Sequence, residues 1–260
     1  MDKFEWFLNM RILRDREQQK IWICQDSYIT KIAKKFGLTY GLVKTPISVD
    51  IKPFDGKATN QDIYHYQEMV GSVMYAAVIT RIDIAKAVNK LAKHATNPSP
   101  IHIQQIKQVI QYLFNIRFLA IEYSPLRKSE SDVVVCASDA SFRDNIDCIS
   151  SEGYLIQLYN GPVDWKATKQ RYVTTSTTKA ELRVVTEAVK RFPEPNFYTS
   201  LRHIDIYHHW LHQEIQSKQL HIQWVDTKRM VADGLTKLLK GQIFVNWRKH
   251  QGLVDIAHLL

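Results

Sequence analysis

One uninterrupted apolar run, VVVCA at residues 133–137, constrains the fold of this chain more than any other feature of the sequence. A strand with one exposed face alternates apolar and polar residues, whereas this run has no polar position. We therefore expect a strand covered on both faces. A polar stretch at 124–132 precedes the run, and the apolar residues before that stretch recur at helical spacing. The run thus begins a sheet domain that follows a partly helical segment.

The segment before residue 124 predicts short strands followed by helices. Three apolar stretches around a charged turn are typical of strands: 6–8, 11–13 and 21–23. Apolar residues at three-and-four spacing predict four helices: 27–36, two within 63–95 that break near Thr80-Arg81, and 101–115. Pro98 and Pro100 end the third of these helices, and residues 44–60 form a loop. This half is a small strand pair followed by a helical bundle.

The segment after residue 124 predicts a sheet with flanking helices. Strands are expected at 154–159 and 163–172, joined by Asn160-Gly161, because both of these residues tolerate the positive φ of a tight hairpin. A helix over 177–192 places Glu181, Val185 and Ala188 along one face. Four further elements follow: a helix at 203–218, a strand at 220–226, and helices from Met230 and about Gly241. The fold class is α+β.

The charge and the cysteine content indicate which kind of partner and which cellular compartment to expect. The net charge of +9 suits a phosphate-rich partner, because basic side chains displace counterions from a nucleic-acid backbone, although an incidentally basic protein has the same balance. The three cysteines form no CxxC pair, which predicts no disulfide scaffold and an intracellular, cytoplasmic or nuclear location. The longest mostly apolar stretch, 69–79, is shorter than the ~20 residues of a membrane span, so no membrane association is expected.

Three carboxylates lie at the ends of predicted elements. Asp139 follows the apolar strand, Glu181 lies in the first turns of the next long helix, and Asp233 opens a helix after the last predicted strand. Carboxylates placed in this way can converge on one spot, where two divalent ions would need several hard oxygen ligands. The alternative is that they are helix caps or solvated charges, as most carboxylates at element ends are.

Several motifs resemble the ribonuclease H domain of copia-type LTR retrotransposon Pol polyproteins. In family order they are ASDASF at 137–142, WKATKQ at 165–170, STTKAE at 176–181, HIDI at 203–206 and VADGLTK at 231–237. The first half is similar to the end of the reverse transcriptase and its connection to ribonuclease H. The motifs there are WFL at 6–8, QDSY at 25–28, VGSVMY at 70–75, TRIDI at 80–84 and YL at 112–113.

The resemblance implies a division of the chain and a chemistry. Residues 1–123 correspond to a reverse transcriptase thumb and connection remnant, and residues 124–260 to a ribonuclease H-like domain with a mixed sheet and flanking helices. Asp139, Glu181 and Asp233 correspond to catalytic, metal-binding carboxylates. They would hold Mg²⁺ and hydrolyse RNA in an RNA–DNA hybrid by two-metal catalysis. Lys166, Lys169 and Arg171 are expected to contact nucleic-acid phosphates, unless they only make an edge strand soluble.

The sequence also departs from the family in ways that predict loss of activity. The polymerase aspartates of the family have no counterpart here. The family's fourth sheet strand, with a further catalytic aspartate, is also missing, and roughly 30 residues are absent before Pro193, judged from a usual strand, helix and loops. We therefore expect weakened Mg²⁺ binding and little or no hybrid cleavage. The alternative function is a non-catalytic module that binds RNA–DNA hybrid or duplex.

Overall fold

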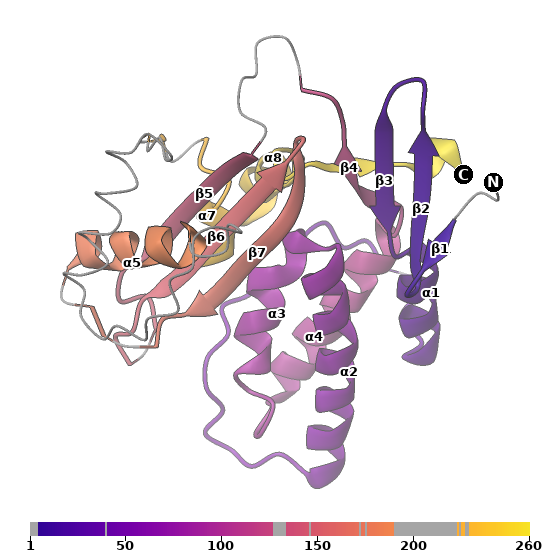
Figure 1. Ribbon diagram of the computed structural model, residues 1–260. Coiled ribbons are helices and arrows are strands. Elements are labelled where there is room, and N and C mark those ends of the chain that lie inside the picture. The colour runs from indigo at the N-terminus through magenta and orange to yellow at the C-terminus, as the bar shows by residue number, and fades with distance from the viewer. Residues whose placement is uncertain are drawn as a thin grey trace. The chain divides into compact units, whose positions relative to one another are not determined.

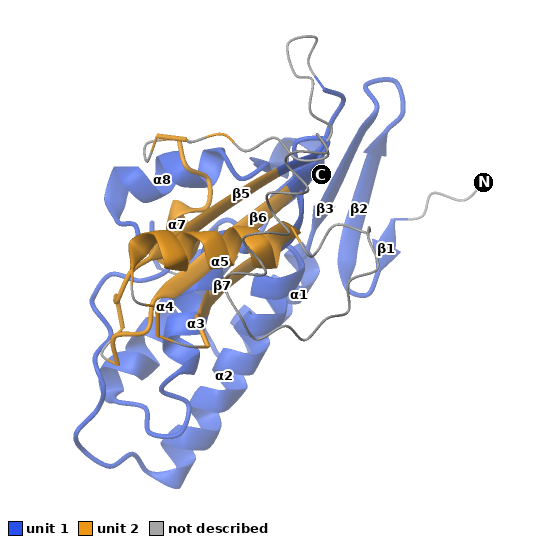
Figure 2. Cartoon of the chain, turned by 60° about the vertical axis from the view of Figure 1, so that its left-hand side comes forward, with its two compact units in different colours: residues 1–135, 157–165, 238–260 blue, residues 136–156, 166–237 orange. Residues whose placement is uncertain are grey.

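The computed structural model describes residues 5–39, 41–126, 134–145, 147–171, 173–174, 176–189, 223, 225–226 and 229–260. The chain divides into two compact units, which Figure 2 distinguishes by colour. The first unit contains residues 1–135, 157–165 and 238–260, and the second contains residues 136–156 and 166–237. The chain therefore passes from the first unit to the second at residue 136, returns at 157, leaves again at 166 and returns at 238. The predicted division at residue 123 concerns ancestry and stays a prediction.

The first unit contains a five-stranded antiparallel sheet (Figure 1). Its strands, in spatial order, are β1 (Trp6–Phe7), β2 (Met10–Asp15), β3 (Lys20–Cys24), β4 (Leu119–Tyr123) and β8 (Leu253–Asp255). The three strands expected near the N-terminus are confirmed. The sequence did not predict β4 or β8, which pair with each other through Leu119 and Asp255, Ala120 and Val254, and Ile121 and Leu253. The expected strand pair is thus part of a larger sheet.

The four expected helices of the first unit are confirmed. They are α1 (Asp26–Lys35), α2 (Asn60–Ile79), α3 (Ala85–Ala92) and α4 (Pro100–Asn115). The break near Thr80 is confirmed too, and a single 3₁₀ turn, η1 (Ile82–Ile84), follows it. Pro100 does not end a helix but begins α4, where its missing N–H costs no hydrogen bond, and the Ser99 side chain caps that helix.

The helices α2, α3 and α4 pack together around a fully buried apolar core. Met69 and Val73 of α2, Leu91 of α3 and Ile106 and Ile110 of α4 have no exposed surface. The sequence placed each of them on an apolar helical stripe, so periodicity alone identified this core.

A charged network is buried within the same unit. The Arg81 guanidinium donates to both carboxylate oxygens of Asp83, at 2.9 and 2.7 Å, and both side chains are fully buried. The Tyr112 hydroxyl donates to Asp83 over 2.7 Å. Arg248, in α8 (Gly241–Lys249), donates to the Tyr112 hydroxyl over 3.0 Å. The network therefore connects the C-terminal helix to the core of the N-terminal helices.

The second sheet has the order β5 (Val134–Ser141), β6 (Ser151–Leu158) and β7 (Gly161–Lys169). The expectation that β5 is covered on both faces is wrong for its first described residues. Val134 is 42% exposed, Val135 is 46% exposed and Cys136 is exposed. Among the described strands, β5 lies at the edge of its sheet. The apolar run thus predicted a strand but not its surroundings.

The hairpin between β6 and β7 turns one residue earlier than the sequence predicts. Tyr159 and Asn160 have the positive φ angles, 48° and 64°, while Gly161 already belongs to β7. Gly161 is required for a different reason: a Cβ atom there would lie 2.5 Å from the Tyr123 ring. The Tyr123 hydroxyl donates to the Pro162 carbonyl over 2.8 Å, so the hairpin tip is fixed beside β4 in the first unit.

The remaining described helices are α5 (Thr177–Val189), α7 (Asp233–Thr236) and α8, with a 3₁₀ turn, η2, at Ala257–Leu259. The helix expected at 203–218 and residues 220–222 and 224 of the strand expected at 220–226 lie outside the described residues, so the mixed sheet stays a prediction. The described part is α+β with antiparallel pairing and is compatible with a ribonuclease H-like fold. Among the described residues, no helix is long and apolar enough to cross a bilayer.

Candidate functional site

Two of the three predicted carboxylates meet in the second unit. Asp139 lies on β5, and Asp233 is the first residue of α7. The Lys237 ammonium forms an ion pair with Asp233 Oδ1 and lies 3.9 Å from Asp139 Oδ2. The Thr236 hydroxyl donates a hydrogen bond to the same Asp139 oxygen. The two carboxylates therefore share one cation supplied by the chain itself.

The position of α7 depends on Gly153 of β6. A Cβ atom at Gly153 would lie 2.6 Å from the Leu235 Cβ and 3.1 Å from the Thr236 Cγ2. Since real Cβ atoms do not approach so closely, only glycine lets α7 lie this near the strand. Leu235 is fully buried and Thr236 is 1% exposed, so the helix is held firmly where Thr236 reaches Asp139.

The electrostatics of this pair favour the charged form of Lys237. Partial burial by itself lowers the pKa of Lys237, but the hydrogen bond to Asp233 and the charges of Asp139 and Asp233 outweigh it, and the pKa is raised. The side chain of Asp233 is 12% exposed and that of Asp139 is 19% exposed, so water screens these charges only partly. Lys237 is therefore a cation at neutral pH.

The third predicted carboxylate does not join this group. Glu181 lies on α5 and is exposed. The sequence placed Glu181 on one helix face with Val185 and Ala188, but the buried residues of α5 are Ala180, Val184, Thr186 and Ala188. Val184 and Ala188 pack with Tyr154 and Ile156 of β6. The expected face was therefore about one residue out of register. Successive residues of an α-helix are rotated by 100° about its axis, so a shift of one residue places Glu181 outside the buried stripe.

The described residues do not supply the ligands that a pair of divalent ions requires. Across the described ranges, no three His, Cys, Asp or Glu side chains lie close enough to hold one metal ion. The two acids that do meet already have Lys237 as their counter-charge. The donor set of the described part thus does not fit a two-metal centre, and the Mg²⁺ expected from the resemblance stays a prediction.

The predicted phosphate contacts are partly engaged in ion pairs. Lys166 lies 2.9 Å from Glu152 and 3.2 Å from Glu187. Lys169 forms an ion pair with Asp147, while Arg171 is exposed. Of the three predicted residues, Arg171 is the one whose charge the structure leaves most accessible to a phosphate.

Three residues of the site were not predicted from the sequence: Gly153, Thr236 and Lys237. Lys237 follows Asp233 by four residues, the spacing at which helical side chains meet, so the ion pair had a sequence signal. Gly153 lies just before the strand expected at 154–159, so no signal in the sequence marked its close approach to α7. The hydrogen bond between Thr236 and Asp139 depends on the fold and had no such signal.

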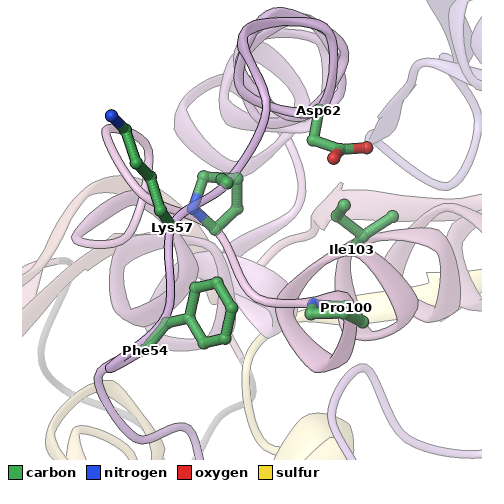
Figure 3. Close-up of a pocket in the computed structure, with 7 residues that line it drawn as sticks. Phe54, Lys57, Asp62, Pro100 and Ile103 are labelled. Atoms are coloured by element: carbon green, nitrogen blue, oxygen red, sulfur yellow. The ribbon is translucent and has the colours of Figure 1, made fainter.

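A pocket of about 270 Å³ lies elsewhere, in the first unit, between the loop before α2 and the start of α4. Figure 3 shows the side chains that line it, among them Phe54, Lys57, Asp62, Pro100 and Ile103. No predicted site residue contributes to this pocket, and its one carboxylate, Asp62, accepts a hydrogen bond from the N-cap residue Thr59. The pocket is a surface hollow of the helical region.

Comparison with known proteins relates this chain to mobile genetic elements. The Retrovirus-related Pol polyprotein from transposon TNT 1-94 of Nicotiana tabacum is 27% identical over 89% of the chain, which covers 20% of that polyprotein. The transposon RE1 Pol polyprotein of Arabidopsis thaliana is 30% identical over 75% of the chain, which covers 15% of it. No family model and no solved structure matches the chain.

A shorter relative matches over most of its own length. The Secreted RxLR effector protein 161 of Plasmopara viticola is 35% identical over 48% of this chain and 87% of that protein. The fold of this chain is α+β, and the chain is a homologue of retrotransposon Pol polyproteins. It belongs to one sequence family with the Plasmopara protein. It spans about a fifth of the length of the first two Pol polyproteins that it matches.

The alignments with two Pol polyproteins are longer than the chain. The alignment with TNT 1-94 has 274 positions, although it includes 89% of a chain of 260 residues. That with the Arabidopsis transposon RE2 has 275 positions and includes 93%. These alignments therefore contain positions of the relatives that have no counterpart here. The Plasmopara alignment has 126 positions for 48% of the chain and contains almost none.

Proposed function

We propose that this chain corresponds to the reverse transcriptase–ribonuclease H part of a retrotransposon Pol polyprotein, and that it does not cleave RNA in RNA–DNA hybrids. The proposal rests on one observation, which is the set of charged groups around Asp139 and Asp233. Asp139 and Asp233 meet, but one of their two charges is offset by Lys237, and Glu181 lies exposed outside the group. Hybrid hydrolysis by two metals requires more anionic oxygens around the cations than this pair provides.

An internal deletion supports the same proposal. The long alignments with TNT 1-94 and RE2 require gaps in this chain, as expected if a strand with a further acid has been lost. Such a loss removes a metal ligand and a strand at once.

A hybrid-cleavage assay tests this function. The purified chain is incubated with a labelled RNA–DNA hybrid in Mg²⁺ and, separately, in Mn²⁺, beside the Asp139→Asn variant. The expected result is no turnover above that of the variant in either metal. Magnesium-dependent cleavage by the wild-type chain that disappears in Asp139→Asn would overturn the proposal. An unrelated active ribonuclease H serves as the positive control for the substrate.

A second candidate function is nucleic-acid binding without cleavage, and the net charge of +9 favours it. If the basic surface neutralises phosphates, the affinity for a duplex must fall steeply as salt rises, because bound counterions are released. Arg171→Ala should weaken binding, whereas Lys169→Ala should weaken it less, since Lys169 is already paired with Asp147. Filter binding over a salt series measures both effects, and no binding at low salt would remove this candidate.

A further inference from the structure

Residues 45–58, here called the strap, run between α1 and α2 without forming a helix or a strand. The first half of the strap is anchored in two ways. Ile47 and Ile51 are buried, and the Ser48 N–H donates to Gln105 Oε1 of α4 over 2.9 Å. Apolar burial therefore contributes to holding this half in place.

Two side chains beside the start of α4 hold the second half of the strap. The Asn97 Nδ2 donates to the Gly56 carbonyl over 2.9 Å, and the Asn97 Oδ1 accepts from the Ala58 N–H over 2.9 Å. The His102 Nε2 lies 2.8 Å from the Lys52 carbonyl oxygen. Since no residue of 52–58 is buried, this half depends on these hydrogen bonds.

The hydrogen bonds of the His102 ring require it to be neutral. The Ser99 N–H donates to Nδ1 over 3.0 Å, and because a backbone N–H can only donate, Nδ1 carries no proton. The Lys52 carbonyl can only accept, so the ring proton lies on Nε2. A second proton would have to bind Nδ1, where it would face the Ser99 N–H and break that hydrogen bond.

The groups packed around this ring give a second proton no counter-charge. The His94 ring stacks on the His102 ring, with centroids 4.1 Å apart and planes inclined by 25°. Lys90 of α3 and Lys93, which follows that helix, add positive charge near His94. The Tyr66 ring of α2 lies 6.5 Å from the His102 ring, and burial raises the pKa of its hydroxyl, which therefore stays neutral.

Three carboxylates of the neighbouring segments have other partners or face water. Asp62 of α2 accepts from the Thr59 hydroxyl, and Asp50 of the strap lies 3.8 Å from the Lys240 ammonium. Asp55, also in the strap, is exposed.

The pKa of His102 shifts in the direction that this geometry requires. Burial lowers the pKa and outweighs the hydrogen bond to the Lys52 carbonyl, which by itself raises it. Because the neutral ring is the fastened one, fastening is fully favoured above the ordinary His pKa of about 6.5 and weakens as the pH falls below that value.

We propose that His102 is an acid-sensitive latch of the strap, and that protonation of its ring releases residues 52–58. Asn97 and Ser99 belong to the same turn before α4. Loss of the hydrogen bond from the Ser99 N–H therefore loosens the turn that carries Asn97, and with it the contact between Asn97 and the Ala58 N–H.

Release would also open the pocket of the first unit. Phe54, Lys57 and Ala58, which line one side of this pocket, belong to the strap, whereas Pro98 and Pro100 lie at the start of α4 (Figure 3). The pocket is therefore complete only while the strap is fastened. This inference concerns the first unit alone and does not rest on the proposed function.

Hydrogen exchange of two strap amides, followed by NMR on the full chain between pH 7 and pH 5, tests the latch. Protection factors are used, because they remove the intrinsic pH dependence of exchange. Below about pH 6.5 the protection of the Ala58 N–H should fall by about tenfold per pH unit, as expected for one linked proton. The Ser48 N–H, in the anchored first half, is the internal control and should keep its protection.

Two variants identify the group that titrates. The amide of His102→Gln can still donate to the Lys52 carbonyl but cannot be protonated, so the protection of the Ala58 N–H should not change with pH. In His94→Gln the latch is intact, and the fall should remain.

Three results would overturn the proposal. The first is equal protection of the wild-type Ala58 N–H at pH 7 and pH 5. The second is an equal loss at Ala58 and Ser48, which would mean that the whole unit loosens. The third is a fall that persists in His102→Gln or disappears in His94→Gln, which would assign the effect to another group. The first two comparisons use the wild-type chain alone and decide the matter even if His102→Gln does not fold.

Discussion

Replacing Asp83 with Asn should strongly destabilise the N-terminal unit. The side chains of Arg81 and Asp83 are both fully buried, and the guanidinium donates to both carboxylate oxygens. Asn keeps the size of Asp but removes its charge, which leaves the Arg81 cation buried without a counter-ion. Breaking such a pair on one side costs about 3–5 kcal/mol. Because a whole domain is stable by only about 5–15 kcal/mol, the loss is a large part of the total.

The assay is urea unfolding followed by circular dichroism, with two further variants as references. Tyr112→Phe removes only the hydroxyl that donates to Asp83 over 2.7 Å, and it should cost about 1–3 kcal/mol. The double variant Arg81→Met with Asp83→Leu removes both charges, so it should be clearly more stable than Asp83→Asn. A free energy of unfolding for Asp83→Asn within about 0.5 kcal/mol of wild type would refute the reasoning.

The pH dependence gives the same experiment a second readout. Burial by itself raises the pKa of Asp83, but the Arg81 guanidinium and the Tyr112 hydroxyl outweigh it, and the pKa is lowered below the ordinary value of about 3.9. A lowered pKa in the folded state stabilises the protein above the unfolded pKa, and this stabilisation is lost as pH falls through the folded pKa. The gap between wild type and Asp83→Asn should therefore be full at pH 7 and shrink in strong acid.

Three further predictions concern single side chains. Gly252 and Gly37 both have positive φ, 73° and 67°, but only at Gly252 would a Cβ meet a backbone carbonyl, at 2.4 Å. Gly252→Ala should therefore lower the free energy of unfolding, measured in urea, by about 1–3 kcal/mol more than Gly37→Ala does. Gly153→Ala should destabilise the second unit, because the added Cβ would push α7 away from β6. Gly71 lies on α2 with open space around it, so Gly71→Ala should stabilise the fold by about 0.4–1 kcal/mol. Thermal melting curves of the two variants test both expectations. Burial, with the charges of His102 and nearby lysines, lowers the pKa of His94 from 6.5 to about 4. Between these values the unfolded chain takes up a proton that the folded chain does not, so the stability falls as the pH drops. His94→Gln should make this fall smaller in urea midpoints measured between pH 7 and pH 4.

The helices of the first unit could be predicted because their signal is local. Each helix buries a stripe of apolar residues at three-and-four spacing, and the residues on that stripe are those found in the core, such as Val73 and Leu91. The strands β4 and β8 could not be predicted, since each is short and is stabilised by a partner distant in the sequence. The exposure of β5 was missed for the same reason: an apolar run specifies a strand, while its neighbours specify its burial.

The candidate site was predictable in part. Asp139 and Asp233 were expected to meet because the sequence placed them at the ends of predicted elements, and both lie near Lys237 although Asp139 is within β5. Glu181 depended on the rotation of α5, and a helical pattern fixes that rotation only to within about one residue, a turn of 100°. The ion pair of Lys237 with Asp233 had a sequence signal in its i,i+4 spacing, whereas the approach of Lys237 to Asp139 depends on the fold and had none.

The pairing of β4 with β8 also fixes the order in which the chain can fold during synthesis. Residues 119–123 leave the ribosome early, but their partner at 253–255 follows only after the entire second unit has been made. Until then, the backbone groups on one side of β4 have no strand to bond, and Leu119, Ala120 and Ile121, which are buried in the native state, lie along that open edge. Contacts so far apart in the sequence form slowly. A nascent chain halted within the second unit therefore exposes the unpaired edge of β4, which is prone to pair with strands of other chains.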